Sequence, residues 1–102
     1  LGAGQGPTEG ALVAGYRIEV GRQAHKALVH LPDQDLPRIA AAIDALAKEP
    51  RPAGCVPVKG APRGTYRVRV GDYRVVYSVL DDERIVVIAR VIRRSESTYR
   101  DL

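Results

Sequence analysis

The residues best suited to chemistry in this sequence are arginines at alternating positions of a short, otherwise apolar run. Arg67 and Arg69 alternate with Tyr66, Val68 and Val70. In a β-strand the two guanidinium groups would lie on one face, with roots roughly 7 Å apart because each residue rises about 3.3 Å. Arginine stays charged and binds phosphate oxygens in pairs through its planar set of N–H groups. The pattern therefore indicates an anionic partner that carries neighbouring phosphates.

Further arginines follow in the same half of the chain, at Arg74, Arg90, Arg93 and Arg94. Residues 1–58 contain six Lys or Arg and six Asp or Glu, whereas residues 59–102 contain ten and six, so the whole net charge of +4 lies in the second part. Such a basic segment favours nucleic acid as the partner. Two alternative interpretations stay open at this point: a solvated basic surface, and neutralisation of the arginines by acidic residues in the predicted turns.

Other kinds of site find little support in the sequence. His25 and His30 are five residues apart, about 500° around a helix, so they do not share a face. Cys55 is the single cysteine, which excludes an intramolecular disulfide and fits a reducing compartment. The acidic run at 81–83 lacks partner ligands and is interpreted as a charged turn. We therefore expect neither a metal site nor a bound cofactor.

The elements that must position the arginines come from both halves of the chain. Residues 1–15 are glycine-rich and are interpreted as a flexible leader without function. Residues 16–20 alternate apolar and polar side chains, which predicts a strand. Apolar spacing predicts two helices, over 22–31 and about 36–48, the second with Asp35 as its N-cap. The two helices would form an antiparallel hairpin with one face for a sheet.

Three strands are predicted after a turn-rich connector at 51–64, which holds three prolines and three glycines. Short turns separate these strands, so neighbours are antiparallel; they span 65–70, 73–80 and 84–92. Residues 95–102 are predicted as a loop and a short helical turn. The fold class is α+β: an N-terminal strand, the helical hairpin, then a three-stranded antiparallel meander. The helices would cover one face of the sheet and leave Arg67 and Arg69 on the other, in one domain over 16–102.

The basic half of the chain also matches a known sequence pattern. The matching segments are Val58-Lys59-Gly60, Tyr66-Arg67-Val68-Arg69-Val70, Asp72-Tyr73-Arg74-Val75-Val76-Tyr77, and Arg93-Arg94 followed by Tyr99. In these segments the chain resembles the RelE/ParE superfamily of bacterial toxins. The resemblance covers about residues 16–100, and its most specific part is the pair of strands around the hairpin. It implies a RelE-like fold.

The RelE branch of that superfamily implies an activity and a set of working residues. RelE-type enzymes cleave messenger RNA in the ribosomal A site, without a metal or cofactor, through attack by the ribose 2′-OH. The resemblance gives catalytic positions to Arg67, Arg69, Arg74, Arg93 and Tyr99, and we add Lys59, Arg63, Arg90 and Arg94 as RNA contacts. In these roles Arg67 and Arg69 would hold the phosphate and stabilise the developing alkoxide. Arg93 would serve the leaving 5′-oxygen, and Tyr99 would stack under a base.

This chain departs from the RelE pattern at two places. Some RelE-type enzymes have Lys at the two strand positions, and many carry a His where this chain has Ile92 and Arg93. Arginine does not deprotonate in proteins, so a general-base role for Arg67 or Arg69 is disfavoured. Two alternatives follow: a ParE-like inhibitor of DNA gyrase, and a non-catalytic member that binds its antitoxin and DNA. Retention of all five implied catalytic positions favours the RelE branch.

The resemblance also implies partners. Toxins of this superfamily are neutralised by a small antitoxin encoded alongside, here RelB-like, whose C-terminal segment would bind a basic face and an apolar groove beside the helices. The expected partners are this antitoxin, the ribosome and its mRNA, with operator DNA bound only through the antitoxin complex. No apolar run approaches the roughly 20 residues of a membrane span, and no secretory signal is evident. We therefore expect a cytoplasmic protein that does not bind membranes.

Overall fold

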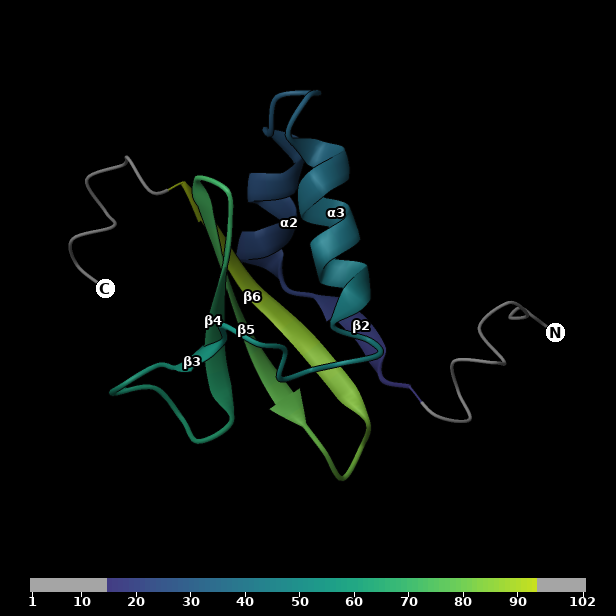
Figure 1. Ribbon diagram of the computed structural model, residues 1–102, viewed down its shortest axis with the longest axis vertical. Helices are drawn as coiled ribbons and strands as arrows, with labels where there is room; N and C mark the ends of the chain where they lie inside the picture. Colours follow the sequence, from purple (N-terminus) through teal and green to yellow (C-terminus); the bar gives the residue numbers. More distant parts are fainter. Residues whose placement is uncertain (1–14, 94–102) are drawn as a thin grey trace, which may run out of the picture.

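The computed structural model describes residues 15–93, which form a five-stranded sheet with two helices on one face (Figure 1). The strands are β2 (Arg17–Val20), β3 (Val56–Pro57), β4 (Thr65–Val70), β5 (Tyr73–Leu80) and β6 (Ile85–Arg93). Across the sheet they follow the order β2, β6, β5, β4, β3. Strand β2 runs parallel to β6, and the other neighbours are antiparallel. The α+β class predicted from the sequence is confirmed.

The helices are α2 (Arg22–Val29) and α3 (Leu36–Ala45), each ending slightly earlier than the spacing predicted. They form because small apolar residues recur at helical spacing and meet the sheet; Ala24 and Ile39 are fully buried. Asp35 is the N-cap residue of α3, but its side chain caps no helix N–H. None of the described helices is long and apolar enough to cross a membrane. The predicted leader and the predicted turn at 95–102 lie outside the described residues, except for Gly15.

The core lies between the helices and the inner face of the sheet. On β5 the buried residues are Tyr73, Val75, Tyr77 and Val79. The residues between them, Arg74, Val76 and Ser78, are half-buried and belong to the other face. This alternation is typical of a strand with one covered face. The sheet therefore has a helix-covered face and an open face, as the sequence predicted.

The connector contains one element that the sequence did not predict. Strand β3 pairs with β4, with Val56 opposite Arg67 and Pro57 opposite Tyr66. A strand of two residues leaves no periodicity to detect, and proline argues against a strand. Proline is tolerated here because β3 is the edge of the sheet. The turn-rich connector thus also supplies an edge strand beside the strand that carries Arg67.

Candidate functional site

The open face of the sheet brings arginines from neighbouring strands together. In the register of β4 and β5, Arg69 lies directly opposite Arg74, and Arg67 lies opposite Val76. Directly opposed residues in an antiparallel pair have Cβ atoms about 5 Å apart, and diagonal neighbours are about 7–8 Å apart. Arg67, Arg69 and Arg74 are therefore mutual neighbours. The structure brings together the three strand positions that the sequence singled out.

These three arginines line a hollow of about 300 Å³, which we call the arginine hollow. Gly54 of the connector and Val56 of β3 complete its lining. Arg67 and Arg74 are half-buried and Arg69 is exposed. Three guanidinium groups around one small space form a site for an anion, because each can donate two parallel hydrogen bonds to neighbouring oxygens.

The strands around the arginine hollow contain no acidic residue. Strands β4, β5 and β6 carry five arginines and no Asp or Glu. Among the residues that the structure describes, no ion pair involves Arg67, Arg69 or Arg90. Like charges repel one another, so such a cluster gains most when an anion joins it. The sequence left open that acidic residues in the turns neutralise the arginines. Within residues 15–93, Arg67, Arg69 and Arg90 form no such ion pair.

The hairpin between β4 and β5 is fixed to the helical layer. Its turn passes through Gly71, whose φ of 60° lies in the left-handed region that glycine tolerates best. The Arg38 guanidinium lies close to this turn, since a Cβ on Gly71 would come within 3.1 Å of its central carbon. The Tyr73 hydroxyl donates to Asp35 at 2.9 Å. Burial, and then this carboxylate, raise the pKa of Tyr73. These contacts hold the strand ends from which two of the arginines project.

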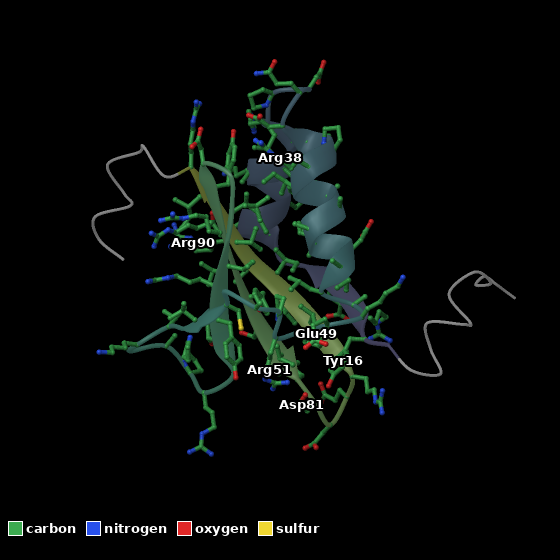
Figure 2. The ribbon with its side chains drawn as sticks, viewed as in Figure 1. Tyr16, Arg38, Glu49, Arg51, Asp81 and Arg90 are labelled. Atoms are coloured by element: carbon green, nitrogen blue, oxygen red, sulfur yellow. The ribbon has the colours of Figure 1, made fainter. Side chains whose placement is uncertain are left out.

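A polar cluster at the far end of the sheet fixes the connector, and we call it the clasp (Figure 2). Arg51 donates to both carboxylate oxygens of Asp81, at 2.7 and 3.3 Å. Its Nε donates to the Tyr66 hydroxyl at 3.1 Å, and its guanidinium carbon lies 5.4 Å from the centre of that ring. The Tyr16 hydroxyl donates to Asp81 at 2.7 Å. The clasp therefore joins four segments that are far apart in the sequence.

The charges of the clasp stabilise one another. Hydrogen bonds from Arg51, and then from Tyr16, hold the pKa of Asp81 below its ordinary value. The same carboxylate, followed by the Tyr66 hydroxyl, raises the pKa of Arg51. Both side chains are substantially exposed, at 40% for Arg51 and 53% for Asp81. Water and salt screen the attraction at such exposure, so the pair fixes geometry more than it adds stability.

The connector is anchored beside the clasp before it reaches the arginine hollow. The buried Tyr77 hydroxyl donates to the Pro50 carbonyl at 2.7 Å. Gly54 and Val56, which line the hollow, follow a few residues later. Sequence reasoning missed Arg51 because a single arginine between two prolines shows neither periodicity nor a motif. The one sequence feature that could have indicated its role is its position at the start of a long connector, which needs a contact with the sheet to fix it.

A second, larger hollow of about 560 Å³ lies between α2 and the last residues of β6, and we call it the helix-side hollow. Strand β2 pairs with β6 only over 85–88, so within residues 15–93 this edge of β6 has no strand neighbour beyond Ile88. Apolar and basic residues share the lining, among them Ala27, Leu31, Val91, Lys26 and Arg93, and Arg90 borders it as well. Among the residues that the structure describes, no acidic one lines it. The combination suits an acidic, amphipathic segment of a partner.

The two predicted arginines of β6 lie on different faces. Arg90 is exposed and stands opposite Val76 on the open face (Figure 2). Arg93 is exposed at the end of the strand, in register with the inward-facing Tyr73. Both arginines border the helix-side hollow, and neither lines the arginine hollow. Arg93 therefore lies outside the arginine hollow, and its implied catalytic role stays a prediction.

The predicted residues in loops are separate from both hollows. Lys59 and Arg63 are exposed between β3 and β4 and line neither hollow. Arg94 and Tyr99 lie outside the described residues. The site that can be built from the structure is thus the arginine hollow, with Arg90 on the same face.

The donors of this site favour phosphate binding over metal or acid–base chemistry. Within residues 15–93, no three His, Cys, Asp or Glu side chains gather as metal ligands would. Cys55 is a free, half-buried thiol. The arginines of the hollow donate hydrogen bonds and keep their protons. They can therefore bind an anion and stabilise charge that develops on it, but they cannot accept a proton.

Known proteins resemble this chain in sequence. Residues 16–98 match the model of a family described as the ParE toxin of the type II toxin–antitoxin system parDE. A Methanocaldococcus jannaschii protein described as a RelE1 toxin is 33% identical over 88 residues, which cover 84% of this chain and 97% of that protein. Both comparisons include the strands of the arginine hollow.

Solved structures resemble it in fold. The toxin chain matched in the archaeal RelE–RelB complex of Pyrococcus horikoshii is 32% identical, with a TM-score of 0.69 and coverage of 80% of this chain and 98% of that one. The chain matched in the RelBE2 complex of Mycobacterium tuberculosis is 30% identical, with a TM-score of 0.69 and coverage of 78% of this chain and 99% of that one. Because ParE and RelE are two branches of one group, these findings identify the group and leave its branch to be argued. The chain belongs to the RelE/ParE superfamily of type II toxin–antitoxin toxins.

Proposed function

We propose that the protein is a RelE-type toxin that cleaves messenger RNA on the ribosome and so inhibits translation. The observation that supports this most is the arginine hollow, three guanidinium groups on an open sheet face whose strands contain no acid. A phosphate of a nucleic acid is the anion that this arrangement suits best. The relatives named RelE share the fold over nearly their whole length.

In the proposed reaction the 2′-oxygen of a ribose bonds to the adjacent phosphorus, and the bond from phosphorus to the next 5′-oxygen breaks. Negative charge grows on the phosphate oxygens as this happens. Arg67 and Arg69, with Arg74 opposite, bind these oxygens and stabilise the transition state. Since arginine does not accept protons, the 2′-OH proton passes to water or to a ribosomal group, and another proton reaches the 5′-oxygen. The resemblance gives Arg93 the role of stabilising or protonating the leaving 5′-oxygen, and this role stays a prediction.

A reconstituted translation system tests this proposal. We expect the purified protein to cut a translated message at codon boundaries, mapped by primer extension, only when ribosomes are present. Arg67→Ala should lower the cleavage rate about 10²–10³-fold, the usual effect of removing one preorganised donor. Arg17→Ala is the matched control, because Arg17 is an exposed arginine paired with Glu19 on β2. An intact message with and without ribosomes would contradict the proposal.

A gyrase inhibitor of the ParE type is the second candidate, favoured by the description of the matching family model. A supercoiling assay on the same preparation separates the two branches. Inhibition of gyrase together with an intact message would establish the ParE branch. A protein that does neither, yet still binds its antitoxin, would be the non-catalytic member that the all-arginine site also permits.

We also propose that a RelB-like antitoxin binds this chain through an acidic, amphipathic segment in the helix-side hollow. Relatives were crystallised as RelE–RelB complexes. The hollow combines apolar Ala27 and Val91 with Lys26 and Arg93, and no acidic residue of 15–93 is in its lining. The edge of β6 beside it is unpaired beyond Ile88 within the described part of the chain, so a segment can add backbone hydrogen bonds there.

Two substitutions on α2 test the antitoxin site. Ala27→Lys places a charge in the hollow and should prevent rescue by the co-expressed antitoxin while cleavage persists. Val29→Lys is the control, because Val29 is 65% exposed on the same helix and does not line the hollow. Equal rescue of both variants would place the antitoxin elsewhere.

Tyr99→Ala is expected to weaken cleavage and leave antitoxin binding unchanged, and loss of both would make Tyr99 structural.

A further inference from the structure

Near the middle of β6, the alternation of its side chains between the two faces of the sheet shifts by one residue. Tyr77 is paired with Ile88, but the preceding residue Val76 is paired with Arg90, so Ala89 is an extra residue in β6. In a regular strand Arg90 would share a face with Ile88, which is fully buried beneath the helices. The bulge turns Arg90 to the open face instead, where Figure 2 shows it on the side away from the helices. Bulges commonly re-aim one side chain beside a functional site.

The register places Arg90 in line with the arginine hollow. Arg67, Val76 and Arg90 stand opposite one another on three adjacent strands. Neighbouring strands lie about 4.8 Å apart, so the roots of Arg67 and Arg90 are about 10 Å apart. Val76 between them is half-buried, and it presents a short apolar side chain rather than an acid. One extended phosphate chain can therefore meet both cations.

Nothing in the described part of the chain occupies Arg90 otherwise. It has no ion pair or side-chain hydrogen bond among residues 15–93, in contrast to Arg17, Arg38 and Arg51. Its strand, like the two beside it on the open face, contains no acid. A regular β6 would bury this charge at a large desolvation penalty, so the bulge both avoids that penalty and adds a cation to the open face.

We infer that single-stranded RNA crosses the strands from the arginine hollow on β4 towards β6, where Arg90, already predicted as an RNA contact, binds it. The inference rests on the proposed function and adds the direction in which the RNA runs across the sheet. The phosphate at the cleavage point lies in the hollow, and a neighbouring phosphate binds Arg90. RNA that followed β4 along its length would pass Arg67 and Arg69 and would not reach Arg90.

Binding of uncleavable RNA tests this direction. We would measure fluorescence anisotropy of 2′-O-methyl oligonucleotides, a trinucleotide and a nonanucleotide, over a range of salt concentrations. Arg90→Ala should leave the trinucleotide affinity unchanged and weaken the nonanucleotide several-fold. The slope of log affinity against log salt should fall by about 0.7, the value for one lost phosphate contact on a single strand. Arg67→Ala should weaken both oligonucleotides, and Arg17→Ala neither.

The outcomes separate this inference from the function on which it rests. If Arg90→Ala behaves like Arg17→Ala while Arg67→Ala weakens binding, RNA does not cross to β6 and the inference fails alone. If Arg90→Ala weakens both oligonucleotides as Arg67→Ala does, Arg90 belongs to the hollow itself and the crossing path is wrong. If Arg67→Ala has no effect on either, the proposed RNA site fails. Circular dichroism of each variant confirms that loss of binding does not come from loss of the fold.

Discussion

Arginine occurs in two different settings on this sheet. In the clasp, Arg51 donates to both oxygens of Asp81 and to the Tyr66 hydroxyl. In the arginine hollow, Arg67 and Arg69 have no ion pair within the described part of the chain. The clasp draws its acid from the turn between β5 and β6, whereas the strands of the hollow contain none. The same side-chain type is paired with an acid at one end of the molecule, whereas Arg67 and Arg69 on the open face have no such partner within residues 15–93.

This difference distinguishes a structural arginine from a binding one. A paired arginine fixes the segments that it joins, and its removal should affect the fold first. A cluster of like charges adds repulsion to the folded state and gains most when an anion binds to it. Natural proteins accept such locally unfavourable arrangements mainly at functional sites. Substitutions in the arginine hollow should therefore lower activity and spare stability, whereas substitutions in the clasp should lower stability and largely spare activity.

The largest expected effect is on activity, in the arginine hollow. Arg67→Ala and Arg69→Ala should each lower ribosome-dependent cleavage about 10²–10³-fold, because each removes a donor aimed at the reacting phosphate. The thermal midpoint should stay unchanged or rise slightly, since the substitution relieves repulsion between like charges. Cleavage rates and thermal unfolding followed by circular dichroism provide the measurements. A midpoint that falls in step with activity would show that these arginines are structural and would remove the contrast with the clasp.

The next effect is on stability, at the anchor beside the clasp. Tyr77→Phe removes the buried hydroxyl that donates to the Pro50 carbonyl. Leaving a buried acceptor without its donor costs about 1–3 kcal/mol. Urea denaturation should show a loss of this size, with cleavage reduced only as far as the connector wall of the hollow loosens. Unchanged stability would mean that the clasp alone fixes the connector.

The sequence predicted the layers of this fold better than its irregular parts. Alternation in β4 and β5 and helical spacing in α2 and α3 repeat over several residues, so their faces could be assigned. Periodicity placed Arg67 and Arg69 on the open face, and the short hairpin turn placed Arg74 on the strand beside them. Strand β3 could not be predicted, because two residues contain no period and one of them is proline.

Two features of the sheet around the site depend on single positions that no sequence pattern indicates. The extra residue Ala89 shifts the phase of β6, and only the pairing with β5 shows that Arg90 is turned to the open face. Arg93 follows three residues later and therefore faces the helices, although the resemblance groups it with the strand arginines of the open face. Arg51 meets Asp81 across 30 residues, and such a contact is set by the tertiary fold alone.

A smaller effect is expected from changes to the clasp itself. Arg51→Lys keeps the charge but cannot donate to both oxygens of Asp81 and to Tyr66 together. The thermal midpoint should fall slightly, and by more in Arg51→Ala, which also loses the contact with the Tyr66 ring. Cleavage should change far less than in Arg67→Ala, because Arg51 lies outside the arginine hollow. An activity loss comparable to that of Arg67→Ala, at unchanged stability, would make Arg51 part of the site.

The smallest expected effect is on the acid dependence of stability. Hydrogen bonds from Arg51 and Tyr16 hold the pKa of Asp81 below its ordinary value in the folded protein. A carboxyl group with a lowered folded pKa stabilises the fold above its unfolded pKa of about 3.9 and loses that contribution as the pH falls through the folded value. The midpoint of Asp81→Asn should therefore lie below that of the parent protein at neutral pH and converge with it in acid. The Arg51→Ala variant should lose the larger part of this acid dependence, because Arg51 is the stronger of the two donors to that carboxylate. Parallel curves for the parent protein and Asp81→Asn down to the lowest pH would show that the clasp stabilises through its hydrogen-bond geometry and not through the charge of Asp81.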